Sequence, residues 1–201
     1  VRLVGSEMCI RDRHEEGNPY SLPGNQVYAI DEDSLHNLWI LTDSGVVNYQ
    51  RHTDRFIPVL DENGDVFKAT SLCKLPGRLL LAGYGKVYQY HYKERKIRTL
   101  HEMKIPSSFF VRKMLLWDER TLLCMSLWKG ILCIDLRNGE RKPSPLPDGN
   151  DLTHVLIDDK DCIWTTAYNK GITCYDRNGK VRAVYTTETV SYTHLRAHET
   201  D

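Results

Sequence analysis

The feature that most constrains the fold is a repeat of about forty residues, of which four copies align between residues 25 and 188. Corresponding anchor residues in the four copies are Tyr49, Tyr90, Ile134 and Tyr175, which are separated by 41, 44 and 41 residues. Each copy contains short runs rich in Val, Ile, Leu, Tyr and Trp, and turn residues separate these runs. No copy holds an apolar stripe at helical spacing, so the pattern predicts an all-β protein.

The length of the repeat and its excess of apolar residues indicate sheets that stack around an axis. Repeats of about 40–45 residues with four strands each are typical of β-propeller blades. A blade packs both faces of its sheet against neighbours, so apolar residues are needed on both faces. We therefore predict an all-β partial β-propeller of about four four-stranded antiparallel blades, and we expect Trp39 and Trp164 to fill the space between blades. The predicted blades cover residues 25–60, 66–100, 109–143 and 150–186.

Turn chemistry supports the strand assignment. Asn138-Gly139 and Asn178-Gly179 predict type I′ hairpin turns, in which both central residues have positive φ. Pro76-Gly77 predicts a tight turn in the second repeat. Cys124 and Cys133 flank another predicted turn, and they form either a disulfide across that hairpin or two core thiols.

The two ends of the chain carry a different pattern. Codons for residues 1–12 can be chosen so that their reverse complement encodes residues 190–201. The nucleotide sequence obtained in this way resembles a transposase adaptor used to prepare DNA libraries. We therefore expect residues 1–13 and 189–201 to be adaptor-derived and not native, with a β-propeller fragment at residues 14–188.

Charge and composition exclude several classes of function. The chain has 27 basic and 27 acidic residues, a balance that creates no field to attract nucleic acid or an anionic membrane. No run approaches the ~20 apolar residues of a membrane helix. The histidines lack metal-site spacing, and Gly83-Tyr84-Gly85 lacks the helix of a phosphate-binding loop. We expect no nucleic-acid partner, no membrane segment in this fragment, no catalytic residue, no metal and no cofactor.

A ligand of such a fold is expected at the mouth of the central channel, where loops of rigid blades converge. Aligned positions on the predicted innermost strands are Tyr28, Thr70, Lys113 and Thr153. Hydroxyl, aromatic and ammonium groups together suit a sugar, because they offer a stacking face together with hydrogen-bond donors and acceptors. The alternative is that these residues line a water-filled channel.

The residues from Asp33 to Tyr49 (DSLHNLWILTDSGVVNY) resemble the two-component regulator propeller repeat, whose pattern is an Asp, a Gly-Asn-Leu-Trp-Ile-Gly-Thr core, a Gly-Leu and a Tyr-Asp. The residues from Asp158 to Asp176 are similar and keep the Trp, Gly, Tyr and Asp of that pattern. Two departures are His36 and Asp161, which stand where the repeat usually has a turn glycine. The resemblance is strong in the first and last repeats and weak in the middle pair.

This resemblance implies a sensory module. Repeats of this family typically occur in the periplasmic sensor region of bacterial hybrid sensor histidine kinases, many of which respond to oligosaccharides. It implies a fragment that recognises a carbohydrate without catalysis. The implied partners are an oligosaccharide, the remaining blades and kinase part of the parent chain, and a second copy in a homodimer. The alternatives are a fragment of a propeller-fold polysaccharide lyase or glycosidase, and a propeller scaffold that binds protein.

Overall fold

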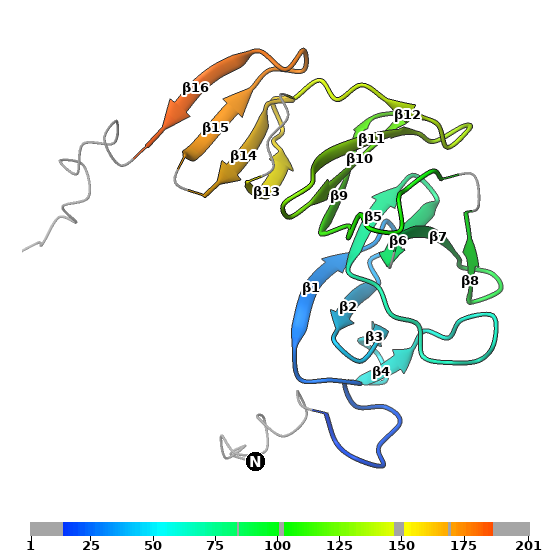
Figure 1. Ribbon diagram of the computed structural model, residues 1–201. Coiled ribbons are helices and arrows are strands. Elements are labelled where there is room, and N and C mark those ends of the chain that lie inside the picture. The colour runs from blue at the N-terminus through cyan, green and yellow to red at the C-terminus, as the bar shows by residue number, and fades with distance from the viewer. Residues whose placement is uncertain (1–13, 84, 101–102, 147–150, 169, 187–201) are drawn as a thin grey trace, which may run out of the picture.

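The computed structural model describes residues 14–83, 85–100, 103–146, 151–168 and 170–186, and all secondary structure in these residues is strand. The strands form four four-stranded antiparallel sheets, arranged around an axis as blades of a β-propeller (Figure 1). The predicted fold class is therefore confirmed. Within the described ranges, no helix is long and apolar enough to cross a membrane. The predicted adaptor-derived ends, residues 1–13 and 189–201, lie outside the described residues.

In every blade the strands follow one another in chain order from the inner to the outer edge. The first blade comprises β1 (Val27–Glu32), β2 (Leu38–Thr42), β3 (Val46–Gln50) and β4 (Arg55–Pro58). The second comprises β5 (Ser71–Leu75), β6 (Arg78–Gly83), β7 (Lys86–His91) and β8 (Lys96–Thr99). The third comprises β9 (Lys113–Asp118), β10 (Thr121–Ser126), β11 (Gly130–Asp135) and β12 (Arg141–Lys142). The fourth comprises β13 (Leu152–Ile157), β14 (Ile163–Ala167), β15 (Gly171–Tyr175) and β16 (Val181–Tyr185).

The hydrophobic core consists of layers between neighbouring blades. Strand β6 shows the principle, because Leu79 and Leu81 pack with residues of the first blade while Leu80 packs with residues of the third. Trp39, which is 1% exposed, fills the layer between the first and second blades as predicted. Trp164 differs from the prediction: it lies on the face of the fourth blade that points away from the third, where it stacks on Tyr185 with ring centroids 6.0 Å apart. No described blade covers that face.

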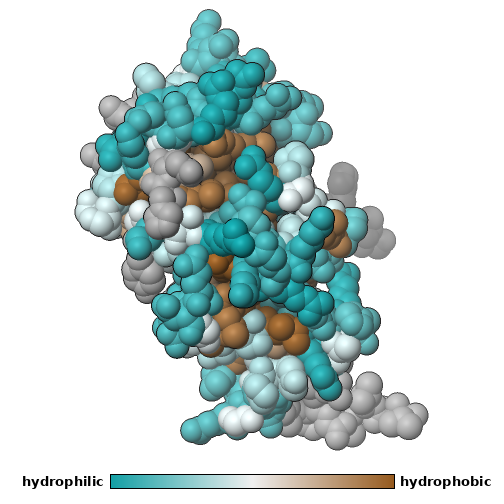
Figure 2. Space-filling model, turned by 90° about the vertical axis from the view of Figure 1, so that its right-hand side faces the viewer, coloured by the Kyte–Doolittle hydropathy of each residue, from teal (hydrophilic) through white to brown (hydrophobic). Residues whose placement is uncertain are grey.

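The outer edge of the molecule is polar. The view from the side of β8 and β12 shows mainly hydrophilic side chains, with smaller hydrophobic patches between them (Figure 2). The buried apolar side chains lie in the layers between blades, and these layers extend to Ile97 in the outermost strand β8.

The Asn-Gly turns are not type I′. Gly139 and Gly179 have φ of 71° and 78°, whereas neither Asn138 nor Asn178 has positive φ. The preceding aspartate explains the geometry in the fourth blade, because the Asp176 carboxylate accepts bonds from the amides of Asn178 (2.9 Å) and Lys180 (3.0 Å). These bonds close a turn that needs positive φ only at the glycine.

Other turn predictions are confirmed. Gly77 has φ of 66° in a two-residue turn, because Leu75 pairs with Arg78. His36 and Asp161, which replace turn glycines, have φ of 62° and 59°. Both residues therefore adopt the left-handed backbone conformation that the glycine of the repeat would have. This conformation costs energy for residues with a Cβ atom.

Cys124 and Cys133 are two core thiols and not a disulfide. In the β10–β11 register Cys124 lies opposite Leu132 and Cys133 lies opposite Leu123. The two thiols therefore point to opposite faces of the third blade. Cys124 joins the layer shared with the second blade, Cys133 joins the layer shared with the fourth, and both are free.

Candidate functional site

The four predicted ligand positions lie together at the inner edge of the blades. Tyr28, Thr70, Lys113 and Thr153 all line one cavity of about 140 Å³. Tyr28 lies in β1, Lys113 in β9 and Thr153 in β13, while Thr70 immediately precedes β5. Each blade therefore contributes one of these side chains, because the innermost strands of a propeller converge on its axis.

The two threonine hydroxyls already have partners in the protein. The Thr70 hydroxyl donates to the backbone carbonyl of Val111 at 2.6 Å, and the carbonyl of Ala82 lies 3.2 Å away. The Thr153 hydroxyl lies 2.6 Å from that of Thr166. Thr70 thus connects the second blade to the segment that leads into the third, and a ligand meets it mainly as an acceptor.

Positive charge gathers in this cavity. Arg112 and Lys113 line it together with His154, and neither cation belongs to any ion pair found among the described residues. Burial, followed by the charges of Lys113 and Arg112, lowers the pKa of His154. Asp31 also lines the cavity, but its carboxylate is 3.4 Å from the Lys74 ammonium group. The site therefore offers cationic donors and a neutral imidazole.

A second cavity, of about 210 Å³, adjoins the first and shares Tyr28, Thr70 and Arg112 with it. It adds Asp43 from the β2–β3 turn and the exposed ring of Phe110. We call the two cavities together the inner groove. Sequence alignment of the innermost strands missed Arg112, His154 and Phe110. The position of Arg112 directly before Lys113 was the available signal.

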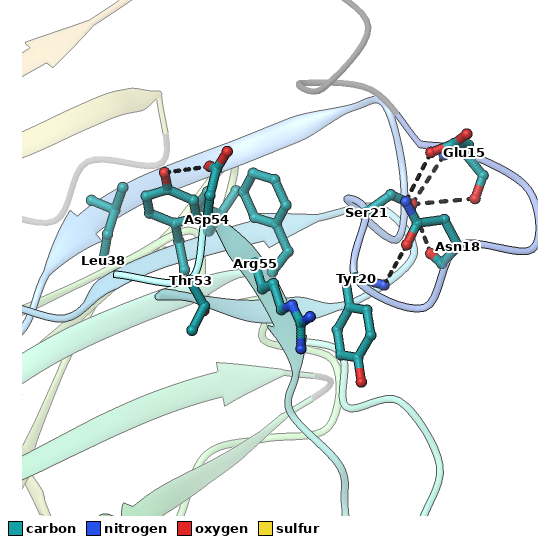
Figure 3. Close-up of a pocket in the computed structure, with 11 residues that line it drawn as sticks. Glu15, Asn18, Tyr20, Ser21, Leu38, Thr53, Asp54 and Arg55 are labelled. Atoms are coloured by element: carbon teal, nitrogen blue, oxygen red, sulfur yellow. Dashed lines mark hydrogen bonds between the residues drawn. The ribbon is translucent and has the colours of Figure 1, made fainter. Parts of the chain in front are cut away.

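The largest of the described cavities, of about 600 Å³, lies elsewhere, between the segment before β1 and the face of the first blade that points away from the second (Figure 3). Leu38, Tyr49 and Phe56 line its sheet side. The Arg55 guanidinium lies 4.5 Å from the centre of the Tyr20 ring and so holds the segment against β4. Nothing in the sequence pattern of the repeat predicted this cavity, because the segment before β1 is outside the repeat.

Acidic side chains near the inner strands serve the turns. The Asp33 carboxylate, in a residue that is 3% exposed, accepts bonds from the backbone amides of Leu35 and Asn37, both at 2.9 Å. Asp158 accepts from the backbone amide of Cys162 at 2.8 Å. Across the described ranges, no group of three or more His, Cys, Asp or Glu residues could hold a metal ion.

Solved structures share this fold. The extracellular domain of a protein described as a one-component system from B. thetaiotaomicron is similar with a TM-score of 0.69 and 17% identity, over 87% of this chain and 26% of that chain. The extracellular domain of a hybrid two-component system from the same organism is similar with a TM-score of 0.66 and 17% identity, over 84% and 24%. A computationally designed protein, Ika8, is similar with a TM-score of 0.57 and 13% identity, over 87% and 52%.

These similarities establish the propeller fold, and this chain spans about a quarter of the length of the two extracellular domains. The comparison with curated proteins found no significant match. The model of the two-component regulator propeller family matches residues 21–44, the segment that ends in the β2–β3 turn and includes the Asp33–Trp39 turn. At residues 21–44 the chain is therefore similar to the repeat of the two-component regulator propeller family.

Proposed function

We propose that this chain is the ligand-sensing part of a two-component system sensor and that it recognises a carbohydrate in the inner groove. The observation that carries the proposal is that side chains from all four blades line one cavity, with Tyr28, Lys113 and Arg112 directed to the same space. An exposed aromatic ring beside cationic donors fits the alternating apolar and hydroxyl surfaces of a sugar.

The family repeat at residues 21–44 supports the role in signalling. The similar domains from B. thetaiotaomicron are extracellular, which supports a periplasmic location for this chain and a parent protein with a kinase part. The use of Asp33 and Asp158 in turns supports binding without catalysis. Signalling follows when a ligand binds two arrangements of the propeller with different affinity.

Isothermal titration calorimetry with cello-, xylo-, manno- and galacturono-oligosaccharides tests the proposal. We expect at least one of these sugars to bind, and Tyr28→Ala and Lys113→Ala to weaken its affinity about tenfold or more. Tyr20→Ala is the matched control, because Tyr20 is an exposed tyrosine that lines the large cavity on the far face of the first blade. Equal affinity of the Tyr28, Lys113 and Tyr20 variants would contradict a site in the inner groove.

A further inference from the structure

Two aromatic side chains of the third and fourth blades form an exposed stacked pair. The rings of Trp128 and Tyr168 are parallel within 6°, and their centroids are 5.7 Å apart. Trp128 is 66% exposed and Tyr168 is 58% exposed. Large aromatic residues usually bury most of their surface in a core or an interface. This pair therefore presents apolar ring faces that are largely uncovered.

The backbone at Trp128 adopts a conformation that costs energy for a residue with a bulky side chain. Its φ of 69° lies in the left-handed region, which residues with bulky side chains rarely adopt. Gly130, two residues later, has φ of 71° and supplies the flexible position of the same turn. Strain of this kind persists where the surrounding structure enforces it and is concentrated at functional sites. A turn that needed only to connect β10 to β11 would be more stable with Asn or Gly at position 128.

The pair lies on the same rim of the propeller as the inner groove. Trp128 lies between β10 and β11, and Tyr168 lies between β14 and β15. The corresponding β2–β3 turn contributes Asp43 to the groove. Backbone bonds tie these turns to the starts of the innermost strands: the amide of Asp43 donates to Gln26 (3.0 Å) and the amide of Tyr168 donates to Asp151 (3.1 Å).

We infer that Trp128 and Tyr168 form a second sugar-binding surface, on which a neutral pyranose ring of an oligosaccharide stacks through its apolar face. Lys170, in the same turn as Tyr168, adds a polar group near the pair, and its ammonium group lies 2.6 Å from the Asp151 carboxylate. A chain of sugars could then occupy the groove and the aromatic pair together. The inference rests on the proposed function for its ligand class, and it adds a separate site.

A glycan microarray bearing neutral and uronate-containing oligosaccharides, followed by calorimetry with a bound glycan, tests this inference. The variants are Trp128→Asn and Tyr168→Ala, with Tyr185→Ala as the matched control, because Tyr185 also stacks on a tryptophan but lies in β16. We expect each rim variant to weaken binding of a neutral glycan about tenfold, and Tyr185→Ala to leave it unchanged. Wild-type affinity in both rim variants, or no bound glycan, overturns the inference.

Thermal unfolding separates a binding role from a structural one. Because Asn tolerates the left-handed region, Trp128→Asn should unfold at the same temperature as the wild type or at a higher one. A lower unfolding temperature together with weaker binding would show that Trp128 acts through folding, and would overturn the inference. The Tyr28→Ala variant distinguishes the two sites. Binding that depends on Tyr28 but not on Trp128 supports the inner groove alone, and the reverse result supports the rim pair alone.

Discussion

The indole of Trp39 donates a hydrogen bond from Nε1 to the Oδ2 atom of Asp33 at 2.7 Å, and the same bond recurs at 2.7 Å between Trp164 and Asp158 in the fourth blade. In both blades the aspartate lies six residues before the tryptophan and also accepts backbone amides of the intervening turn. In the first blade the bond thus couples the turn between the first two strands to the layer between blades.

Loss of this bond should destabilise the first blade more than the fourth. Trp39→Phe keeps much of the apolar volume but removes the donor, so the free energy of unfolding should fall by about 2 kcal/mol, the value of a bond to a charged group. Trp164→Phe is the matched control and should cause a smaller loss, because Trp164 is only half buried whereas Trp39 is fully buried. Urea unfolding followed by circular dichroism measures both. Equal losses would mean that burial does not set the strength of the bond.

The free energy of unfolding should fall in acid, in part because the Asp33 carboxylate becomes protonated. Burial acts to raise the pKa of this carboxyl, but bonds from Trp39, Asn37 and Leu35 outweigh burial and hold the pKa below the ordinary 3.8. A lowered folded-state pKa contributes stability above the unfolded-state value, and that stability is lost as the pH falls through the folded-state value. Asp33→Asn should be less stable than the wild type at about pH 6 and should lose less stability between about pH 4 and pH 2. Parallel curves for the two proteins would contradict this.

The hydroxyl of Thr70 should stabilise the junction between the second and third blades. Thr70→Val removes the donor to the Val111 carbonyl while keeping the shape, so we expect a loss of about 1 kcal/mol in the free energy of unfolding. Thr70→Ser should restore most of it. Thr153→Val serves as a control, because its hydroxyl contacts Thr166 within one blade. A Thr70→Val protein with the free energy of unfolding of the wild type would show that this hydrogen bond does not contribute to stability.

The buried thiols should resist alkylation. Burial raises the pKa of Cys73 and of Cys133 to about 11, and it raises the pKa of Cys124 further. Because the thiolate is the reactive form, iodoacetamide at about pH 8 should label these cysteines slowly in the folded protein and rapidly in urea. Peptide mapping by mass spectrometry measures each site. Rapid labelling of Cys124 without urea would contradict its place in the core.

The face of the fourth blade that points away from the third blade should promote self-association. Leu156, Ile172 and Tyr185 are all exposed on this face, beside Trp164. Apolar patches of this kind mark interaction surfaces. We expect size-exclusion chromatography with light scattering to show oligomers or aggregates, and an Ile172→Lys, Tyr185→Ser double variant to shift the protein toward monomer. A wild-type chain that remains monomeric at all concentrations would contradict this.

The sequence predicts the repeated part of the structure well. The anchors at Tyr49 and Tyr175 repeat with the blade, and the apolar runs around Leu80 reveal sheets buried on both faces, because these features follow from strand periodicity. The alignment of the innermost strands also selected Tyr28 and Thr153, which line one cavity in the structure. The role of each strand is encoded locally, so it can be inferred from the pattern.

Features that depend on three-dimensional neighbours were not predicted. The aspartate bonds that shape the Asn178-Gly179 turn depend on a side chain at Asp176, which the turn dipeptide does not contain. The stacking of Trp128 on Tyr168 joins loops of two different blades. The internal partner of the Thr70 hydroxyl is a carbonyl of the next blade. The last two relationships join residues of different blades, so no local sequence pattern shows them.

The alternation of Leu79, Leu80 and Leu81 in β6 between two layers has a consequence for how the molecule comes apart. A central blade packs against a neighbouring blade on each face, whereas the first and fourth blades each have one described neighbour. Opening should therefore begin at the periphery and move inward, as fraying does in a stacked array. Amide protons of β6 and β10 should be the last to exchange with solvent deuterium.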